Sequence, residues 1–412
     1  MVNAFLNSLL DETIYVGLPE GMGGGDGNHC LLLLKALYGL KQAPRLWQLE
    51  FSKTLTNLGL RRSSEEICLY QNEYVIMFFF VDNVITLYHP DHEKRYHTLW
   101  AQISMKYEAR NMGEISWFLG MRIIRDHESR SIYLCQDAYI EKIANRFHLL
   151  DKKGNEESFL NTPLPTWAKL TKYDGMASKQ DIHLYQQKIG SLLFPTMITQ
   201  PDIALTTSKL SSFMSNPSPL HIKLADHCIK HMYKHRHLAV KFGPTGGPNA
   251  SVFTAASDAA FADNPDRKSS QAYIFMLYGG PIDWVARRGK TVTTSITEAE
   301  LLVLSKGAKQ MMWWNQVFKD LSFNPGESTL DCDNHQTVQA MIKNEPIQTR
   351  LRHIDIHNHW LRQEHQAGHI NIRWIPTNEM PADGLTKALA ADRHRRFVQQ
   401  LGMVNIRDRI SG

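Results

Sequence analysis

Short apolar runs dominate the first third of the chain, and the longest is YVIMFFFVDNVITLY at residues 74–88. This run is too short for a membrane helix and carries Asp82 at its centre. Aromatic and β-branched residues on both sides of the Asp82-Asn83 pair favour a β-hairpin, with the Asp82 carboxylate at an exposed tip. Residues 115–124 and 131–135 predict a second hairpin, and residues 138–149 predict a helix that follows it.

The pattern then changes twice along the chain. Residues 185–213 and 221–235 have helical periodicity, and the polar or glycine- and proline-rich residues 152–165 and 243–249 are typical of linkers. After the second linker, the pattern predicts strands at 252–256, 272–277 and 282–286, a helix at 296–321, a strand at 329–333, helices at 335–343 and 352–365, and a strand at 370–375. This order predicts a mixed α/β fold for the last third of the chain.

Composition narrows the class of protein. A chain of 412 residues can form two or three domains, and a net charge of +5 permits nucleic acid as a partner without requiring it. The five cysteines are scattered singly, and the first residues lack a secretory signal, so we expect reduced thiols and an intracellular protein. The glycine-rich residues 21–28 lack the Lys-Ser/Thr ending of a phosphate-binding loop.

Four acidic residues occur where metal-dependent phosphodiester hydrolysis would need them. Asp258 follows an apolar run, Asp333 ends the strand pattern LDCD, and both positions suit the edge of a sheet. Glu300 lies early in the long predicted helix, and Asp383 lies in the loop NEMPADGLTK. Hard divalent cations take oxygen ligands and need several converging carboxylates. Any one of these acids alone is more often a solvated surface group.

The strings around these acids are similar to the ribonuclease H domain of copia-type long-terminal-repeat retrotransposons. SDAAFAD resembles the first-aspartate motif, SSQAYIFMLYGGPIDWVARRGKTVTTSITEAE the strand pair and glutamate helix, and CDNHQTVQ the third acid; LRHIDIHNHWLRQ and IRWIPTNEMPADGLTKAL continue the series. The resemblance implies that Asp258, Glu300, Asp333 and Asp383 bind two Mg²⁺ or Mn²⁺ ions and cleave the RNA strand of RNA–DNA hybrids. Ala260, Ala272 and Gly289 depart from the family pattern without removing a metal ligand.

Histidine and basic residues offer further candidate contacts. His353 and His357 are one helical turn apart and could bind zinc together with His359, but the resembling family string has histidines at 353 and 359. We therefore favour substrate contact or packing for them, with Arg352, His353 and His359 as nucleic-acid-binding candidates. Arg362 and Arg373 could also meet phosphates, and scattered solvated charges are an equal alternative.

The first part of the chain resembles the second half of the copia-type reverse transcriptase palm. LLKALYGLKQAPRLW at residues 33–47 resembles a template-positioning segment and supplies Lys35, Lys41 and Arg45, and MGEISWFLGMRI at residues 112–123 resembles the primer-gripping hairpin. FVDN keeps Asp82 but places Asn83 where the family has a second aspartate. The opening residues, MVNAFL, resemble the segment just after the first palm aspartate, so we expect that acid to be absent. An amide oxygen can ligate a cation without charge, so Asn83 weakens the polymerase site.

Together these observations predict an α/β (α+β) protein with a partial polymerase palm, a helical connection and a ribonuclease H-like domain built on a mixed five-stranded sheet. The predicted segments are palm and thumb at 1–165, connection at 166–248, ribonuclease H at 249–392 and a tail at 393–412. We expect an RNA–DNA hybrid ribonuclease whose degenerate polymerase region is inactive alone. Alternatives are a reverse transcriptase that is active when upstream residues are restored, and a non-catalytic nucleic-acid-binding relic.

The resemblance also implies partners and a location. Expected partners are a template–primer, an RNA–DNA hybrid and other Gag or Pol products, with no membrane. The expected location is the cytoplasm, inside a virus-like particle, or the nucleus.

Overall fold

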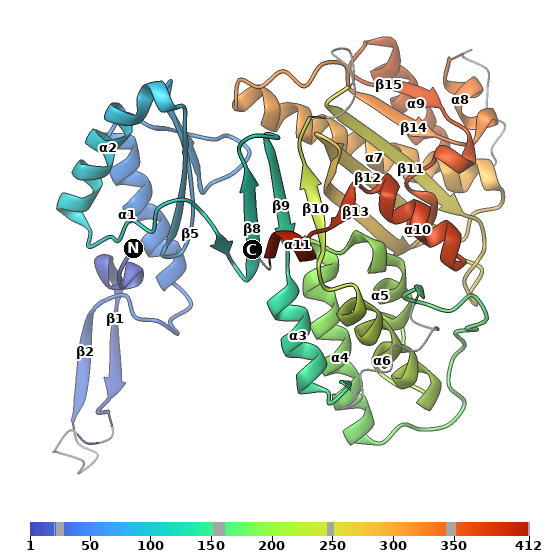
Figure 1. Cartoon of the computed structure of the whole chain (residues 1–412), viewed down its shortest axis with the longest axis horizontal. Coiled ribbons are helices and arrows are strands. Elements are labelled where there is room, and N and C mark those ends of the chain that lie inside the picture. The colour runs from blue at the N-terminus through green and yellow to red at the C-terminus, as the bar shows by residue number, and fades with distance from the viewer. Residues whose placement is uncertain (20, 22–28, 151–160, 245–250, 343–351, 411–412) are drawn as a thin grey trace. The chain divides into compact units, whose positions relative to one another are not determined.

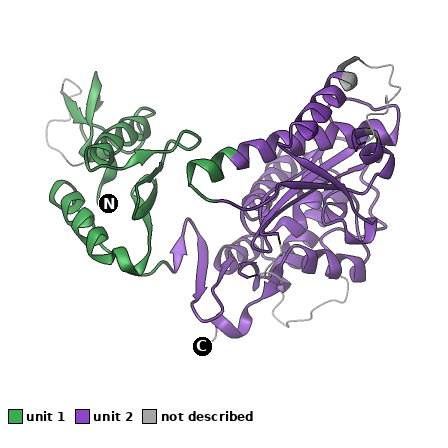
Figure 2. Cartoon of the chain, turned by 90° about the horizontal axis from the view of Figure 1, so that it is seen from above, with its two compact units in different colours: residues 1–115, 316–323 green, residues 116–315, 324–412 purple. Residues whose placement is uncertain are grey.

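The computed structural model describes the chain except residues 20, 22–28, 151–160, 245–250, 343–351 and 411–412 (Figure 1). Most of the predicted glycine-rich loop and of both linkers lies outside the described residues. The chain divides into two compact units, Met1–Ile115 with Gln316–Phe323 and Ser116–Asn315 with Asn324–Gly412 (Figure 2). These units do not coincide with the four predicted segments, whose boundaries stay a prediction.

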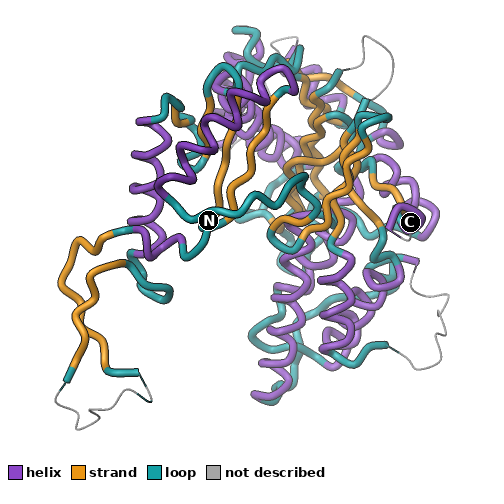
Figure 3. Tube along the Cα trace, turned by 60° about the vertical axis from the view of Figure 1, so that its left-hand side comes forward, coloured by secondary structure: helices purple, strands orange, loops and turns teal. Residues whose placement is uncertain are grey.

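Unit 1 contains two antiparallel sheets. β1 (Leu9–Gly17) pairs with β2 (Cys30–Lys35) in a narrow ladder that Figure 3 shows extending away from the helices of the unit. The second sheet has the order β3 (Arg61–Arg62), β4 (Leu69–Gln71), β5 (Val75–Phe80) and β6 (Asn83–Tyr88). β5 and β6 pair Phe80 with Asn83, which confirms the first predicted hairpin and leaves Val81 and Asp82 at its turn.

The core of unit 1 follows directly from two periodicities. Val75, Met77 and Phe79 are buried on one face of β5, as period-two alternation requires. Trp47 and Phe51 are spaced four apart on α1 (Ala43–Asn57), which puts them on one helical face, and their rings stack with centroids 5.0 Å apart. The Trp47 indole N–H donates to the Val81 carbonyl at 2.6 Å and holds the hairpin turn against the helix. The unit also contains α2 (Glu93–Lys106) and the 3₁₀ turns η1 (Ala4–Asn7) and η2 (Pro90–His92).

Unit 2 contains a five-stranded antiparallel sheet built from three distant parts of the sequence. Its order is β16 (Met403–Asn405), β10 (Leu238–Phe242), β9 (Ser131–Cys135), β8 (Met121–Asp126) and β7 (Trp117–Phe118). The β8–β9 pair confirms the second predicted hairpin. Two features are new, because β10 is inserted beside β9 and the predicted tail supplies the edge strand β16.

A group of helices adjoins this sheet (Figure 1). It consists of α3 (Asp137–Arg146), α4 (Lys179–Ile198), the 3₁₀ turn η4 (Pro201–Ile203), α5 (Ala204–Ser211) and α6 (Pro219–Lys234). The single helix predicted at 185–213 is wrong in one respect, because α4 ends at Ile198. Gln200 precedes Pro201, and the proline ring disfavours helical backbone at the residue before it; Gln200 has φ −123° and ψ 64°. Ser218 caps α6 and Pro219 begins it, as both residue types favour.

The second sheet of unit 2 confirms the predicted mixed five-stranded sheet. Its order is β13 (Gly280–Arg288), β12 (Ser270–Leu277), β11 (Phe253–Ala260), β14 (Thr329–Cys332) and β15 (Asn371–Trp374). β13, β12 and β11 are antiparallel, whereas β11, β14 and β15 are parallel. Seven of the eight residues of β11 are buried, the pattern of a central strand covered on both faces.

Helices and short turns complete unit 2. They are α7 (Ile296–Asp320, whose last turn counts with unit 1), α8 (His335–Ile342), α9 (Arg352–Gln366), η5 (Thr377–Glu379), η6 (Asp383–Leu385), α10 (Ala391–Gln400) and α11 (Arg407–Ile410). Ala259 of β11 packs against Ala299 and Val303 of α7, and these small side chains let the helix approach the strand closely. Within the described residues, none of the helices combines the length and the apolar content needed to cross a bilayer.

Candidate carboxylate metal site

Asp258 and Asp333, two of the predicted site residues, lie close together because β11 and β14 are parallel neighbours. β11 pairs Ser257 with Cys332 of β14. Asp258 is the next residue within β11, and Asp333 directly follows the last residue of β14, so the two carboxylates lie at the same edge of the sheet. The sequence predicted each acid at a strand end, and the register explains why they meet.

Glu300 reaches this edge from α7. Its Oε1 accepts a hydrogen bond from the Ala259 backbone N–H at 3.2 Å, which fixes the side chain beside β11. Oxygen atoms of Asp258, Glu300 and Asp333 all lie within 4.8 Å of one another. Asp258 is 1% exposed and Glu300 3% exposed, whereas Asp333 is half-buried.

Asp383, the fourth predicted acid, lies beside the cluster in η6 and joins it through a lysine. The Lys387 ammonium donates a hydrogen bond to Asp383 and lies 3.7 Å from Asp258 Oδ2. Arg393 of α10 also contacts Asp383, at 3.4 Å. The Thr386 hydroxyl donates to Asp258 from the same turn. The structure therefore brings all four predicted acids into one region, with Lys387 between two of them.

Burial and mutual repulsion raise the proton affinity of the inner acids. Burial raises the pKa of Asp258 to about 6, and the charges of Asp333 and Asp383 add to this while Lys387 and Thr386 oppose it. Burial, and then the charges of Asp258 and Asp333, also raise the pKa of Glu300 well above its usual range. Burial disfavours the Lys387 ammonium, yet Asp258 and Asp383 raise its pKa overall. The site therefore concentrates negative charge that a cation would neutralise.

The residues present fit a hard divalent cation. The candidate ligand atoms are carboxylate oxygens, which Mg²⁺ and Mn²⁺ prefer. Within the described part of the chain, the buried Glu300 Oε2 has no hydrogen-bond partner, so one inner oxygen is left for a ligand. Neighbouring side chains fix Asp333, because Thr377 donates its hydroxyl to Oδ2 at 2.8 Å and the Trp374 indole donates to the backbone carbonyl at 3.0 Å.

The predicted histidine and arginine contacts of α9 do not all lie on its exposed surface. His359 is exposed on α9, whereas the side chains of Arg352 and His353 lie outside the described residues. His357 Nδ1 lies 2.8 Å from the Ser305 hydroxyl, so it packs α9 against α7. Among the residues that the structure describes, neither His357 nor His359 belongs to a three-ligand metal cluster.

The two arginines that were predicted to meet phosphates differ in exposure. Arg362 is 7% exposed, so the prediction that it meets phosphates is wrong: it lies on the inner face of α9. Arg373 pairs bidentately with Asp331, at 2.8 and 3.0 Å.

In unit 1, the predicted polymerase residues lie at the hairpin tip. Asp82 and Asn83 are exposed, and the Asn83 amide donates to Asp82 Oδ1 at 3.4 Å. The Met1 ammonium donates to the Asp82 carbonyl at 2.6 Å. No three-ligand group found among the described side chains includes Asp82.

The basic residues of unit 1 lie on its surface. Lys35 and Lys41 are exposed, and Arg45 pairs with Asp11 at 3.4 Å.

The sequence prediction missed the residues that hold the acids in place. Lys387 and Thr386 lie within the string ADGLTK, of which only Asp383 was predicted to belong to the site. A lysine one helical turn after an acid is a recognisable signal for an ion pair. The sequence around Arg393 does not indicate its ion pair with Asp383, because that contact depends on the position of α10 in the fold.

The fold and the site define a ribonuclease H-like α/β sheet with a carboxylate cluster. Residues 1–160 match the family of reverse transcriptases (RNA-dependent DNA polymerases). The chain is 30% identical to the retrovirus-related Pol polyprotein from transposon TNT 1-94 of Nicotiana tabacum, over 97% of this chain and 30% of that protein. The polyprotein from transposon RE1 of Arabidopsis thaliana is 28% identical, over 98% of this chain and 27% of its own length.

A putative Ty5-1 transposon protein of Saccharomyces cerevisiae is 30% identical, over 74% of this chain and 97% of that protein. The chain belongs to the copia-type retrotransposon Pol family. It spans less than a third of the two plant polyproteins.

Solved structures with some likeness include an LC11 ribonuclease H1 in complex with an RNA/DNA hybrid. It is 15% identical with a TM-score of 0.26, over 32% of this chain and 92% of that chain. The prototype foamy virus protease–reverse transcriptase is 10% identical with a TM-score of 0.24, over 90% of this chain and 63% of that chain.

Proposed function

We propose that unit 2 hydrolyses the RNA strand of RNA–DNA hybrids at the site formed by Asp258, Glu300, Asp333 and Asp383. The convergence of three carboxylates at one edge of the β11–β14 pair carries the proposal. A pair of Mg²⁺ or Mn²⁺ ions bound there would supply a nucleophilic water and stabilise the leaving oxygen of the phosphodiester. Membership of the Pol family supports a nucleic-acid substrate.

The acids and the residues that contact them favour binding of a cation. Asp258 and Glu300 are buried, so their charges are poorly solvated and each favours a nearby cation strongly. Lys387 neutralises part of this charge and links Asp383 to Asp258. Thr377 orients Asp333, which is the least buried of the three converging acids and therefore the one that a scissile phosphate would meet first. Contacts to the ribose 2′-hydroxyl would select RNA over DNA.

The test compares three substrates with the whole chain in Mg²⁺. These are a hybrid labelled on RNA, the same hybrid labelled on DNA, and duplex RNA. We expect cleavage of the RNA strand of the hybrid alone. Glu300→Gln should abolish it, because a neutral amide cannot supply the missing ligand charge. Glu298→Gln is the matched control: Glu298 lies two residues away, and a glutamine oxygen can still accept the Thr294 hydrogen bonds.

We also propose that this chain alone extends no primer, although a template–primer is a partner consistent with its family. Asp82 and Asn83 supply one charged oxygen ligand at the hairpin tip, and nucleotide addition by two metal ions needs more. Primer extension should therefore be absent for the wild-type chain and for Asn83→Asp. Extension by the chain with family-like upstream residues added would favour the alternative of a truncated but competent polymerase.

A further inference from the structure

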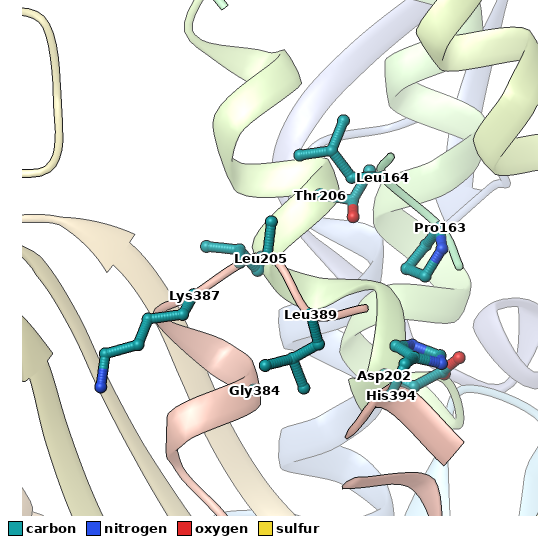
Figure 4. Close-up of a pocket in the computed structure, with 10 residues that line it drawn as sticks. Pro163, Leu164, Asp202, Leu205, Thr206, Gly384, Lys387, Leu389 and His394 are labelled. Atoms are coloured by element: carbon teal, nitrogen blue, oxygen red, sulfur yellow. The ribbon is translucent and has the colours of Figure 1, made fainter. Parts of the chain in front are cut away.

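A second cluster of ligand-type side chains lies inside unit 2, away from the acids. Asp202 comes from η4, His231 from α6 and His394 from α10. One ligand atom from each lies within 4.8 Å of the others, and all three residues are at most 6% exposed. Figure 4 shows Asp202 and His394 side by side at one end of the pocket, while Lys387 extends away from them.

Two polar atoms of this cluster are buried without a protein partner. Within the described residues, neither Asp202 Oδ1 nor His394 Nε2 has a hydrogen bond. Buried polar atoms are rarely left unpaired in folded proteins, because they have lost their hydrogen bonds to water. A ligand that accepts electron pairs from both atoms would remove this cost.

The spacing of the cluster suits a shared cation better than a direct ion pair. His231 Nε2 and Asp202 Oδ2 are 3.8 Å apart, which is too long for a hydrogen bond. Ligands at about 2.0–2.1 Å from a tetrahedral zinc ion are separated by about 3.3 Å. The observed separation therefore requires only a small closure around an ion.

A neighbouring backbone group orients His394 to bind a cation. The ring has a hydrogen bond with the Asp202 backbone, and a second contact of this kind commonly fixes the orientation of a metal-binding imidazole. His394 is 6% exposed, so this contact is buried together with the ring.

We propose that Asp202, His231 and His394 form a structural Zn²⁺ site that fastens α10 to η4 and α6. Two imidazoles and one carboxylate match the ligand preferences of zinc, whereas Mg²⁺ prefers oxygen alone. The site joins parts of the sequence as far apart as residues 202 and 394. It also adjoins the acidic site, because Arg393, next to His394, contacts Asp383.

A fourth ligand completes a tetrahedral structural site. His235 is one helical turn after His231, its ring centroid lies 4.7 Å from that of His231, and its Nε2 lacks a hydrogen bond within the described residues. His235 is therefore the side chain that we assign to the fourth position.

The experiment measures zinc binding by the whole chain after chelation of its metals. Zn²⁺ is added to the Asp333→Asn variant in a buffer that contains a large excess of Mg²⁺ over Zn²⁺. Both the substitution and the Mg²⁺ keep zinc from being retained at the carboxylate site. We expect one zinc ion per chain after gel filtration and a rise in the thermal unfolding temperature. Asp202→Asn and His394→Gln should each weaken zinc binding by more than about tenfold, since each removes a ligand. His183→Gln, an exposed histidine of α4, is the matched control and should bind zinc normally.

A second readout keeps the proposal testable if those variants fail to fold. Co²⁺ bound in place of zinc gives strong visible absorption when it is four-coordinate, and His235→Gln should weaken that absorption. Absence of both zinc retention and this absorption in the folded parent would overturn the proposal. Zinc binding that is equally strong in Asp202→Asn and His394→Gln would overturn it as well. Because no outcome depends on cleavage, the proposed ribonuclease activity can fail separately.

Discussion

Replacing Asp258 with asparagine should abolish cleavage and at the same time stabilise the metal-free protein. Asparagine has nearly the same shape, and its amide oxygen can still accept the Thr386 hydrogen bond. The substitution removes a negative charge that is 1% exposed and lies beside Glu300 and Asp333. The charge is needed to bind a cation, but without the cation it costs folding free energy.

The magnitude follows from the shifted pKa. The pKa of Asp258 rises from 3.8 to about 6, which corresponds to about 3 kcal/mol of lost folding free energy at neutral pH. The sign is that of a raised pKa: the folded state binds the proton more tightly than the unfolded state does. The cost is absent below about pH 3.8, develops as the pH rises to 6 and is constant above it.

The assay is hydrogen exchange of β11 and β12 amides in increasing urea, with chelator present, at pH 8 and pH 5. Asp258→Asn should be more stable than wild type by about 3 kcal/mol at pH 8 and by about half as much at pH 5. Asp392→Asn, an exposed acid of α10, should change little at either pH. Equal or lower stability of Asp258→Asn at pH 8, or an advantage that does not change with pH, would refute the reasoning.

Three further substitutions test other contacts. Gly384→Ala would place a Cβ 2.5 Å from the Phe397 ring, so we expect a loss of about 1–3 kcal/mol of folding free energy, and slower cleavage because Asp383 is adjacent. The control Gly190→Ala, whose Cβ would meet nothing within 4 Å, should not destabilise the protein, and thermal unfolding of both variants tests this. Phe51→Ala should cost unit 1 about 3–5 kcal/mol, measured by hydrogen exchange in β5, and unchanged exchange there would contradict the packing described. Arg373→Ala leaves the buried Asp331 without its partner, and because Arg373 is 57% exposed we expect only about 1–2 kcal/mol in urea unfolding; no loss would show that water replaces the arginine.

Much of the fold could be predicted because its strands and helices have clear periods. β5 alternates buried and less buried residues before the hairpin turn at Val81 and Asp82, and α7 is one long helix. The break between α4 and α5 was missed because the apolar pattern continues across it. Proline geometry at Gln200 outweighs that pattern. The pairing of β16 with β10 could not be predicted, since three residues carry little pattern.

The acidic site was predicted in its residues but not in its geometry. Asp258 and Asp333 were expected at strand ends, yet only the parallel register places them together. The family resemblance supplied Asp383 but not the Lys387 contact that links it to Asp258. Asp202, His231 and His394 escaped prediction because they lie far apart in the sequence and none has metal-ligand spacing with another.

The most direct measurement is single-turnover cleavage of an RNA–DNA hybrid, labelled on RNA, by the whole chain and by Asp333→Asn. Both proteins are first shown to be folded by hydrogen exchange of β11 and β14. We predict Mg²⁺-dependent cleavage by the wild-type chain and its loss in Asp333→Asn, because that substitution removes a carboxylate from the site. A folded wild-type chain that leaves the hybrid intact, or Asp333→Asn that cleaves at the wild-type rate, would contradict it.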